Sequence, residues 1–257
     1  MTGSRLKIIA IITMFIDHFA AVYLERVMDA EHVYVNYDNF SGMGALAWTY
    51  LIMRLIGRVA FPIFIFLLIE GVCHTRNRWK YLGRLAVFAL ISEIPFDMAF
   101  NLSDDAVFSG RLLELTSQNV FFTLAIGLLT IIILDMLDKK IKGEKAGIYV
   151  LKGIASLAVI IVFATFAEFF GTDYGFYGVL AICAAWFCKD NRRLLMIVVC
   201  VILTLSSTLE LAAFFAITPV SFYNGERGSG RKYTFYAFYP IHLLLLWGLC
   251  LFMGYMK

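Results

Sequence analysis

The chain alternates between long apolar runs and short polar segments. Eight runs approach or exceed the roughly 17–20 residues that a helix needs to cross the hydrocarbon core of a bilayer. Residues 43–56 fit either an interfacial helix or an extension of the second span. The eight predicted spans cover residues 6–24, 57–73, 81–100, 119–136, 148–167, 174–188, 194–216 and 235–253.

The composition places these runs in a membrane rather than in a soluble core. Hydrophobic residues make up 61% of the 257 residues and charged residues only 16%, against roughly 25% in a soluble domain. A soluble fold of this size could not bury so much apolar surface. We therefore predict an all-α polytopic integral membrane helical bundle of about eight spans (eight to ten) in contact with the lipid bilayer. Residues 1–257 show no internal repeat or linker and are expected to form one domain.

Charge and cysteine use narrow the possible functions. The net charge of +3 gives no sign of nucleic-acid binding. The five cysteines lie in or beside apolar runs without a Cys-x-x-Cys pair, so we expect neither a metal site nor a disulfide framework.

Lys and Arg residues are distributed unevenly among the loops. They concentrate at the N-terminus and in the loops TRNRWK, DKKIKGEK and KDNRR, whereas the intervening loops are acidic or neutral. Because cytoplasmic loops are enriched in Lys and Arg, this alternation predicts that both termini are cytoplasmic. The basic loop NGERGSGRK (224–232) breaks the pattern, since it falls on the outer side. Either the span count is wrong by one, or these cations have a function.

Two ionisable residues, Asp17 and His18, lie side by side in the middle of the first span. An ionisable group in hydrocarbon costs roughly 2.5–3.5 kcal/mol on insertion scales, so such groups mark functional sites. Lys7 lies eleven residues before His18, close to three helical turns, which places both on one helix face. Adjacent helical residues do not face each other. Asp17 is therefore expected to pair with another group, such as an arginine, or to reach His18 only through local distortion.

Further polar residues lie in or beside the later spans. Glu93 and Asp97 are four residues apart and share a helix face, although Pro95 between them bends or ends that helix. They suit a proton relay, a cation site or a clamp for an amine, or else an ion pair with Arg58 or Arg84. The loop TRNRWK signals topology or binds the phosphates of a nucleotide-like donor. His242 follows the aromatic segment YAFYP, where a structural role is the simpler interpretation.

Four long strings in this sequence resemble the TraX family of membrane proteins, typified by the acetylase of conjugative pilin. They are LKIIAIITMFIDHFA, GRVAFPIFIFLLIEGVCHTRNRWKYLGRLAVFALISEIPFDMAFN, NVFFTLAIGLL and NGERGSGRKYTFYAFYPIHLLLLW. They occur in the family's order and cover about half the chain. The family is in turn similar to a wider class of multispan acyltransferases marked by a basic residue, ten others and a catalytic His. Here that motif is Lys7-x10-His18.

The resemblance implies an acyltransferase in the bacterial inner membrane that uses acetyl-CoA as co-substrate. His18, with Asp17 beside it, is the expected catalytic centre: His18 as general base deprotonates an amine or hydroxyl as it attacks the thioester. The acceptor is expected to be a peptide, a glycan or a small amine. From charge and membrane side, the coenzyme A phosphates are assigned to Lys7, Arg76, Arg78 and Arg84. The residues assigned to the acceptor are Glu93, Asp97, Asn119, Arg227 and His242.

Two other functions fit the buried polar groups less well. A proton-coupled secondary transporter would use Asp17, His18, Glu93 and Asp97 as its proton path, but transporters usually contain two similar halves, which this chain lacks. A membrane assembly factor without catalysis would leave the buried His and carboxylates unexplained.

Overall fold

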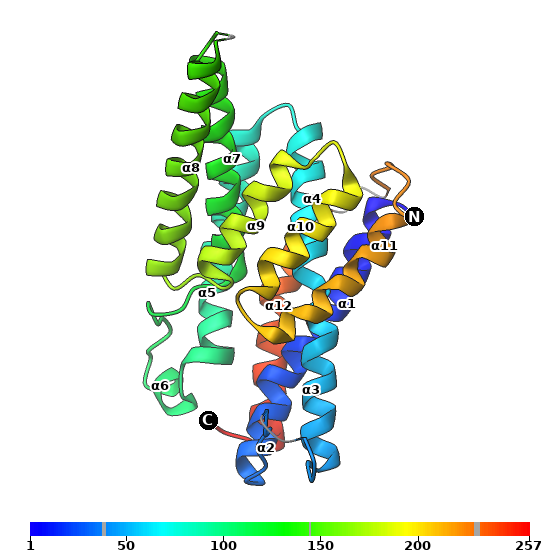
Figure 1. The fold of residues 1–257 in the computed structure, drawn as a ribbon. Coiled ribbons are helices and arrows are strands. Elements are labelled where there is room, and N and C mark those ends of the chain that lie inside the picture. Colours follow the sequence, from blue (N-terminus) through cyan, green and yellow to red (C-terminus); the bar gives the residue numbers. More distant parts are fainter. Residues whose placement is uncertain (38–39, 144, 229–231) are drawn as a thin grey trace. The chain divides into compact units, whose positions relative to one another are not determined.

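The computed structural model describes residues 1–37, 40–143, 145–228 and 232–257. The described residues form helices and no strand, which confirms the all-α prediction. The elements are α1 (Gly3–His18), η1 (Phe19–Leu24), α2 (Glu25–Ala30), α3 (Ala45–Gly57), α4 (Ala60–His74), α5 (Arg78–Phe96), η2 (Asp97–Asn101), α6 (Asp104–Phe108), α7 (Val120–Lys140), α8 (Ala146–Phe169), α9 (Gly175–Phe187), α10 (Arg192–Thr204), η3 (Thr208–Ala216), α11 (Ile217–Ser221) and α12 (Lys232–Met253) (Figure 1).

Several helices have the length and composition of membrane spans, so the protein is a multi-pass membrane protein. Within the described residues, five helical stretches qualify: Gly3–Ala30, Ala45–His74, Val120–Lys140, Ala146–Phe169 and Thr234–Met253. Gly175–Phe187 and Thr208–Ser221 are shorter apolar helices. Residues 45–57 extend the second span, as one of the two interpretations predicted. Helix α5 covers most of the predicted span 81–100, but charged side chains interrupt its apolar stretch.

The packing divides the chain into two compact units. The first comprises residues 1–64, 91–114 and 212–257, and the second comprises 65–90 and 115–211. The division describes packing only, and a single domain over 1–257 stays a prediction.

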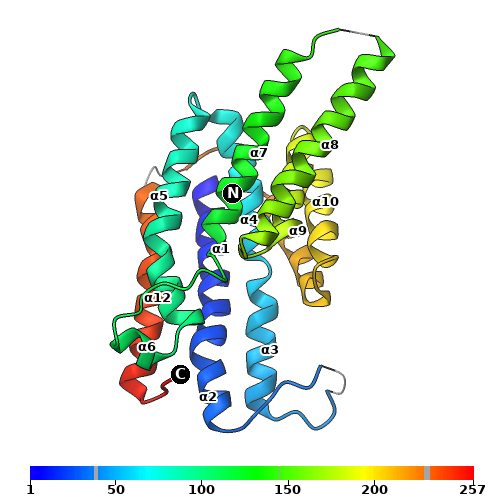
Figure 2. The ribbon, with the colours of Figure 1, turned by 90° about the vertical axis from the view of Figure 1, so that its left-hand side faces the viewer.

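The first unit is built around the continuous helix formed by α1, η1 and α2. Helix α3 packs against α1, and α12 packs against α1 and η1 (Figures 1 and 2). Helices α1 and α12 run parallel, because Lys7 lies beside Phe235 near their starts and Arg26 contacts Tyr255 past the end of α12. Gly57 lets α3 approach α1 closely, since a Cβ there would lie 2.2 Å from Asp17. Such close approach through small residues is typical of helix pairs in membranes.

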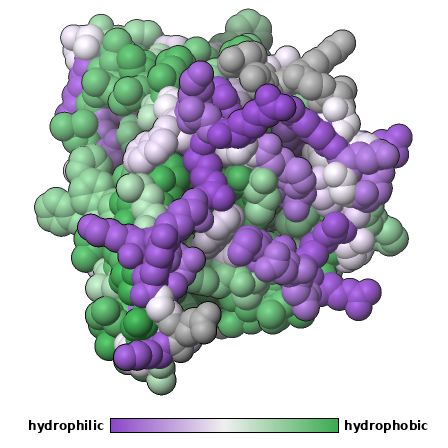
Figure 3. All heavy atoms as spheres, turned by 90° about the horizontal axis from the view of Figure 1, so that it is seen from above, coloured by the Kyte–Doolittle hydropathy of each residue, from purple (hydrophilic) through white to green (hydrophobic). Residues whose placement is uncertain are grey.

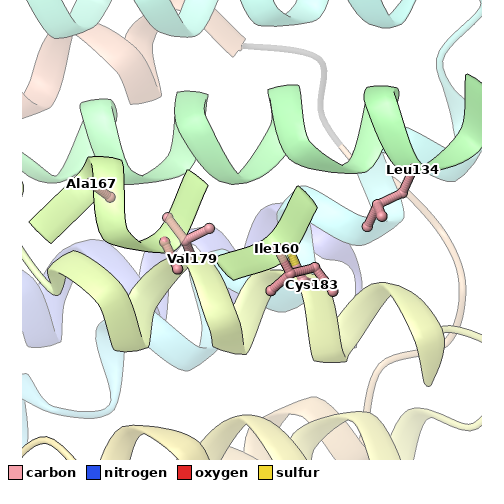
Figure 4. Close-up of a cluster of buried hydrophobic side chains, with 6 residues drawn as sticks. Leu134, Ile160, Ala167, Val179 and Cys183 are labelled. Atoms are coloured by element: carbon pink, nitrogen blue, oxygen red, sulfur yellow. The ribbon is translucent and has the colours of Figure 1, made fainter. Parts of the chain in front are cut away.

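The second unit contains the antiparallel hairpin of α7 and α8, against which α9 packs, and α10 packs against α9 (Figure 2). Its core joins side chains from α7, α8 and α9: Leu134, Ile160, Ala164, Ala167, Val179 and Cys183 (Figure 4). Gly127 on α7 admits Ile182 of α9, since a Cβ at that glycine would lie 2.5 Å from its side chain. Close packing of small against branched residues therefore holds this unit together.

Hydrophilic side chains gather across the middle of the face seen from above, and hydrophobic side chains border much of it (Figure 3). This distribution is the one expected where helices end at a membrane surface.

Backbone hydrogen bonds place the loop after α11 beside the N-terminus. The amides of Gly3 and Ser4 donate to the carbonyls of Glu226 (2.8 Å) and Arg227 (3.0 Å). These carbonyls satisfy N–H groups that the first turn of α1 leaves without helical partners. The described part of the 224–232 loop therefore lies beside the N-terminus, which favours a span count wrong by one, the first of the two alternatives left open for this loop.

The two chain termini lie at opposite ends of the 28-residue helix Gly3–Ala30, which is roughly 42 Å long at 1.5 Å per residue. Met1 contacts Phe222 at one end of it, and Tyr255 contacts Arg26 at the other. The termini thus lie at opposite ends of this helix, and the prediction that both are cytoplasmic stays a prediction.

The predicted span 194–216 is not one helix. Helix α10 ends at Thr204, and η3 begins at Thr208. The Ser206 hydroxyl donates to the Leu203 carbonyl (2.7 Å), and the Ser207 hydroxyl accepts from the Leu209 amide (3.3 Å). Such local side-chain bonds compete with helix continuation. This break is the place in the described chain where the predicted span count is open to an error of one.

Candidate functional site

Two histidines from different helices form the centre of the first unit. Nδ1 of His18, the last residue of α1, lies 2.7 Å from Nε2 of His242 on α12. The ring planes are 9° from parallel and the centroids are 4.9 Å apart, so the two rings lie nearly in one plane with their nitrogen edges facing each other. His242 is buried and His18 is half-buried. The sequence analysis assigned them separate roles, as base and as acceptor-binding residue, whereas the structure joins them in one hydrogen bond.

The hydrogen bonds fix the tautomers of the neutral pair. Nδ1 of His242 lies 2.8 Å from the Phe238 carbonyl oxygen, which can only accept, so this nitrogen carries the proton. Nε2 of His242 is then an acceptor, and Nδ1 of His18 must donate to it. His18 therefore keeps its lone pair on Nε2. A partner that fixes the tautomer and orientation of a histidine in this way is a feature of general-base catalysis.

Aromatic rings surround the histidine pair. The edges of Phe100 and Tyr239 face His18, with ring centroids at 5.4 and 5.8 Å. Phe238 stacks on His242 at 4.8 Å. An apolar environment strengthens the hydrogen bond within the pair and limits the access of water.

Two π-helical turns lie next to this site. The turn η1 follows His18 directly, and η2 contains Phe100. They pack against each other, and both contact α12. π-helical turns inside α-helices occur frequently at functional sites. They widen the helix locally, so His18 and the residues after it can both face α12.

Asp17 points away from His18, toward α3. Its carboxylate accepts from Arg54 Nη1 (2.7 Å) and from Arg58 Nη2 (2.9 Å). This confirms the expectation that Asp17 pairs with arginine. Since both carboxylate oxygens are bound, Asp17 does not orient His18 directly. These ion pairs hold α1 against α3, and a catalytic role for Asp17 stays a prediction.

Lys7 shares a helix face with His18, as the spacing predicted, because both residues contact α12. The Lys7 ammonium lies 5.4 Å from the centre of the Phe235 ring, a cation–π contact. Arg227 lies at the same end of the unit, where its carbonyl accepts from Ser4 and its side chain is exposed. Lys7 and Arg227 therefore place positive charge at the N-terminal end, about 17 Å along α1 from His18 at 1.5 Å per residue.

The carboxylates Glu93 and Asp97 differ in their surroundings. Asp97 is fully buried; it accepts from Asn101 Nδ2 (2.7 Å) and from the Glu114 amide (2.8 Å). Its carboxylate thus anchors the segment after η2, which argues against the predicted acceptor-binding role. Glu93 is buried in the same unit and stays a candidate for an amine.

The other predicted binding residues belong to the second unit. Arg78 pairs with Asp135 (2.9 Å) and stacks on Trp186. Arg84 stacks on Tyr81, and Arg76 is exposed. Asn119 caps α7: its oxygen accepts from Phe121 and its nitrogen donates to the Ala89 carbonyl. The side chains of Arg78 and Asn119 are thus engaged in structural contacts, which argues against their predicted binding roles.

The described residues contain no cluster of His, Cys, Asp and Glu that could hold a metal ion.

Sequence comparison matches one protein family over nearly the whole chain. A profile of the family described as TraX protein matches residues 2–250. The chain belongs to the TraX family. A Dichelobacter nodosus protein described as probable fimbrial assembly protein FimC, serogroup H1, is 30% identical over 265 residues, which cover 94% of this chain and 93% of that protein. No solved structure matches. The resemblance seen in the four strings is thereby confirmed.

Sequence reasoning missed how the site of this TraX-family protein is assembled. The partnership of His242 with His18 joins residues 224 positions apart, and no local pattern encodes it. The available signal was weak: a histidine four residues after Phe238, at the spacing that lets its ring bond a helix carbonyl. Arg54 carried a stronger signal, because a cation in an apolar run requires an anionic partner.

Proposed function

We propose that this TraX-family protein is an integral-membrane acyltransferase that transfers an acetyl group from acetyl-CoA to an amine or hydroxyl acceptor. The hydrogen-bonded pair of His18 and His242 carries the proposal. It leaves a lone pair on His18 Nε2 in the middle of a membrane helix, in aromatic surroundings. A buried ionisable pair with a fixed tautomer is difficult to explain as packing alone.

In this proposal His18 Nε2 removes a proton from the acceptor as the acceptor nitrogen or oxygen attacks the thioester carbon. The resulting imidazolium is stabilised by its Nδ1–H bond to His242, which becomes charge-assisted. Collapse of the tetrahedral intermediate breaks the carbon–sulfur bond. The proton held on His18 passes to the departing thiolate, which restores the neutral pair and releases coenzyme A.

Lys7 and Arg227 are the residues of the first unit that suit the donor's phosphates. They lie at the N-terminal end, so a long pantetheine arm would run along α1 to reach His18. Since acetyl-CoA is a cytoplasmic metabolite, this end would face the cytoplasm in the bacterial inner membrane. Glu93 is the remaining candidate for holding an amine acceptor. The name of the Dichelobacter relative favours an amine on a fimbrial subunit over a glycan or a free small amine.

The test is acceptor-dependent release of coenzyme A by the purified protein in detergent. The variant is His18→Ala and the matched control is His74→Ala, which removes an exposed histidine. Loss of release in His18→Ala with full release in His74→Ala is the expected result, with acetyl-CoA binding retained in both. Equal turnover in the two variants would disprove the role of His18. Absence of acetyl-CoA binding by the wild type would instead direct attention to proton-coupled transport.

A further inference from the structure

A second buried cation, Arg26, lies at the opposite end of the first unit from Lys7. It is eight residues beyond His18 on α2 and only 6% exposed. Its Nη1 donates to Asp104 Oδ2 (2.8 Å) and to the Tyr255 carbonyl (3.2 Å). The proposed acyl transfer gives this residue no role.

The rest of the Arg26 guanidinium has no acceptor. Nε and Nη2 are both buried and make no hydrogen bond to any residue that the structure describes. These two nitrogens form one edge of the planar group, with parallel N–H bonds directed the same way. That edge matches the two oxygens of a carboxylate or phosphate, which Arg binds in bidentate fashion. Buried donors without acceptors are costly, so such an edge indicates a ligand.

The carboxylate next to Arg26 is already engaged by other donors. Asp104 is fully buried and is shared among three donors: Arg26 Nη1, the Trp247 indole (2.8 Å) and the Lys257 amide (2.6 Å). Asp104 therefore holds one side of the Arg26 guanidinium and leaves the Nε/Nη2 edge to another acceptor.

The location also suits an oxyanion. Arg26 is 23 residues from Gly3, roughly 34 Å along the helix, slightly more than the thickness of a bilayer's hydrocarbon core. It therefore lies at the level of lipid headgroups when Gly3 lies at the other interface. Its cover is the five-residue helix α6 and the non-helical segment Tyr255–Lys257. Short elements of this kind open locally at low cost and would admit a ligand.

We propose that the Nε/Nη2 edge of Arg26 binds an oxyanion, a phosphate or carboxylate group, at the end of the molecule opposite to Lys7. Asp104 and the Tyr255 carbonyl hold the guanidinium so that this edge stays directed at the ligand. The source of the group is either a lipid headgroup or a small soluble anion.

The experiment measures anion binding by the delipidated full-length protein in detergent, through thermal stabilisation and native mass spectrometry. The probes are inorganic phosphate, acetate and phosphatidylglycerol, with a neutral galactolipid as control. Arg26→Lys keeps the charge but loses the two-donor edge, and Arg5→Lys makes the same change at an exposed arginine. We expect anion affinity to fall about tenfold or more in Arg26→Lys and to stay unchanged in Arg5→Lys.

The probes also identify the source. Binding of phosphatidylglycerol but not of phosphate or acetate assigns the site to a headgroup, and binding of the free anions assigns it to a small ligand. Equal affinity in Arg26→Lys and the wild type, or no stabilisation by any probe, overturns the proposal. Should Arg26→Lys fail to fold, the wild type still decides: native mass spectra without one retained anion or lipid per chain also overturn it. None of these results depends on acyl transfer.

Discussion

At the scale of single residues, the chemistry of His18 depends on which neighbouring atoms are already hydrogen-bonded to other groups. The Phe238 carbonyl accepts a hydrogen bond from His242 Nδ1, which fixes the tautomer of His242. Because Nε2 of His242 is then an acceptor, Nδ1 of His18 carries the proton of the bond between the two histidines. Asp17, although adjacent to His18 in sequence, is engaged by Arg54 and Arg58. His242 thus fixes the tautomer of His18, and Asp17 holds the helix that carries His18.

The first residue-scale prediction concerns His242. His242→Phe keeps a ring at this position but removes the Nε2 acceptor, so His18 loses the partner that fixes its tautomer. We expect turnover to fall by about 10²-fold or more, the usual size of a general-base contribution, with acetyl-CoA affinity unchanged. His242→Gln, whose amide oxygen can accept the same hydrogen bond, should recover part of the rate. Single-turnover kinetics together with a donor-binding assay measure both quantities, and full activity of His242→Phe would contradict the mechanism.

The second residue-scale prediction concerns Asp17. Asp17→Asn leaves two guanidiniums side by side in a membrane helix pair without a balancing charge. Breaking a buried ion pair from one side costs about 3–5 kcal/mol, so the melting temperature in detergent should drop by several degrees. Asp29→Asn, an exposed aspartate on the same continuous helix, is the control. If the two variants melt together, the ion pairs of Asp17 do not stabilise the contact of α1 with α3.

At the scale of elements, the first unit is organised by two helices that run in the same direction. Helix α12 meets the α1–α2 helix at Lys7, His18 and Val22 in turn, and Tyr255, just past the end of α12, meets Arg26. A straight α-helix brings positions 3.6 residues apart onto one face, and the wider turn η1 adjusts this register after His18. The catalytic candidate and the buried arginine therefore share one helix–helix interface, although they lie at different depths.

The prediction at this scale concerns Gly57, where α3 crosses α1. A Cβ at this position would lie 2.2 Å from Asp17, so Gly57→Ala must push the helices apart. Overpacking of this kind costs about 1–3 kcal/mol, and the displaced arginines would weaken their bonds to Asp17. Gly153→Ala is the matched control, because no atom lies within 4 Å of a Cβ there and alanine favours a helix. Thermal unfolding should show Gly57→Ala less stable than the wild type, and Gly153→Ala equal or more stable; the reverse order would refute the close contact.

At the scale of the whole molecule, the proposed function depends on which segments of the chain lie at each end of the first unit. The N-terminus and residues 222–227 share one end of the first unit, and residues 255–257 lie at the other end. The cations Lys7 and Arg227 thus gather at one end of the first unit. The proposed donor site and the proposed oxyanion site at Arg26 therefore lie at opposite ends of this unit.

This arrangement predicts the result of cysteine labelling in intact cells and inverted vesicles. In a Cys73→Ser background, which removes the exposed native thiol, a membrane-impermeant maleimide should label Arg5→Cys and Glu226→Cys from the same side. Asp105→Cys should react only from the opposite side. Labelling of Glu226→Cys and Asp105→Cys from one side would mean that the helix Gly3–Ala30 does not cross the membrane.

The sequence predicted the fold class better than the points at which helices break, and both outcomes have a physical reason. A chain segment in lipid must hydrogen-bond all its backbone N–H and C=O groups internally, and a helix does so. An apolar run therefore predicts a helix, and helices occur at all eight predicted positions. The point at which a helix ends within an apolar run depends on competition between helical hydrogen bonds and local side-chain hydrogen bonds. At Ser206 and Ser207 the side-chain hydroxyls bond the backbone, and the helix ends there. A break of this kind leaves the predicted span count open to an error of one.

For the candidate site as well, the sequence predicted some features and only the tertiary structure showed the others. The sequence by itself determined that the chain is a helical membrane protein, that Lys7 and His18 share a helix face, and that Asp17 needs a cationic partner. These statements follow from helix periodicity and from the cost of charge in hydrocarbon. Only the tertiary structure decided that His242 is the partner of His18, that Asn119 bonds the Ala89 carbonyl and Asp97 the Glu114 amide, and that Arg26 keeps two buried donors without an acceptor. Hydrogen bonds between residues more than two hundred positions apart depend on packing in three dimensions, which a one-dimensional pattern does not record.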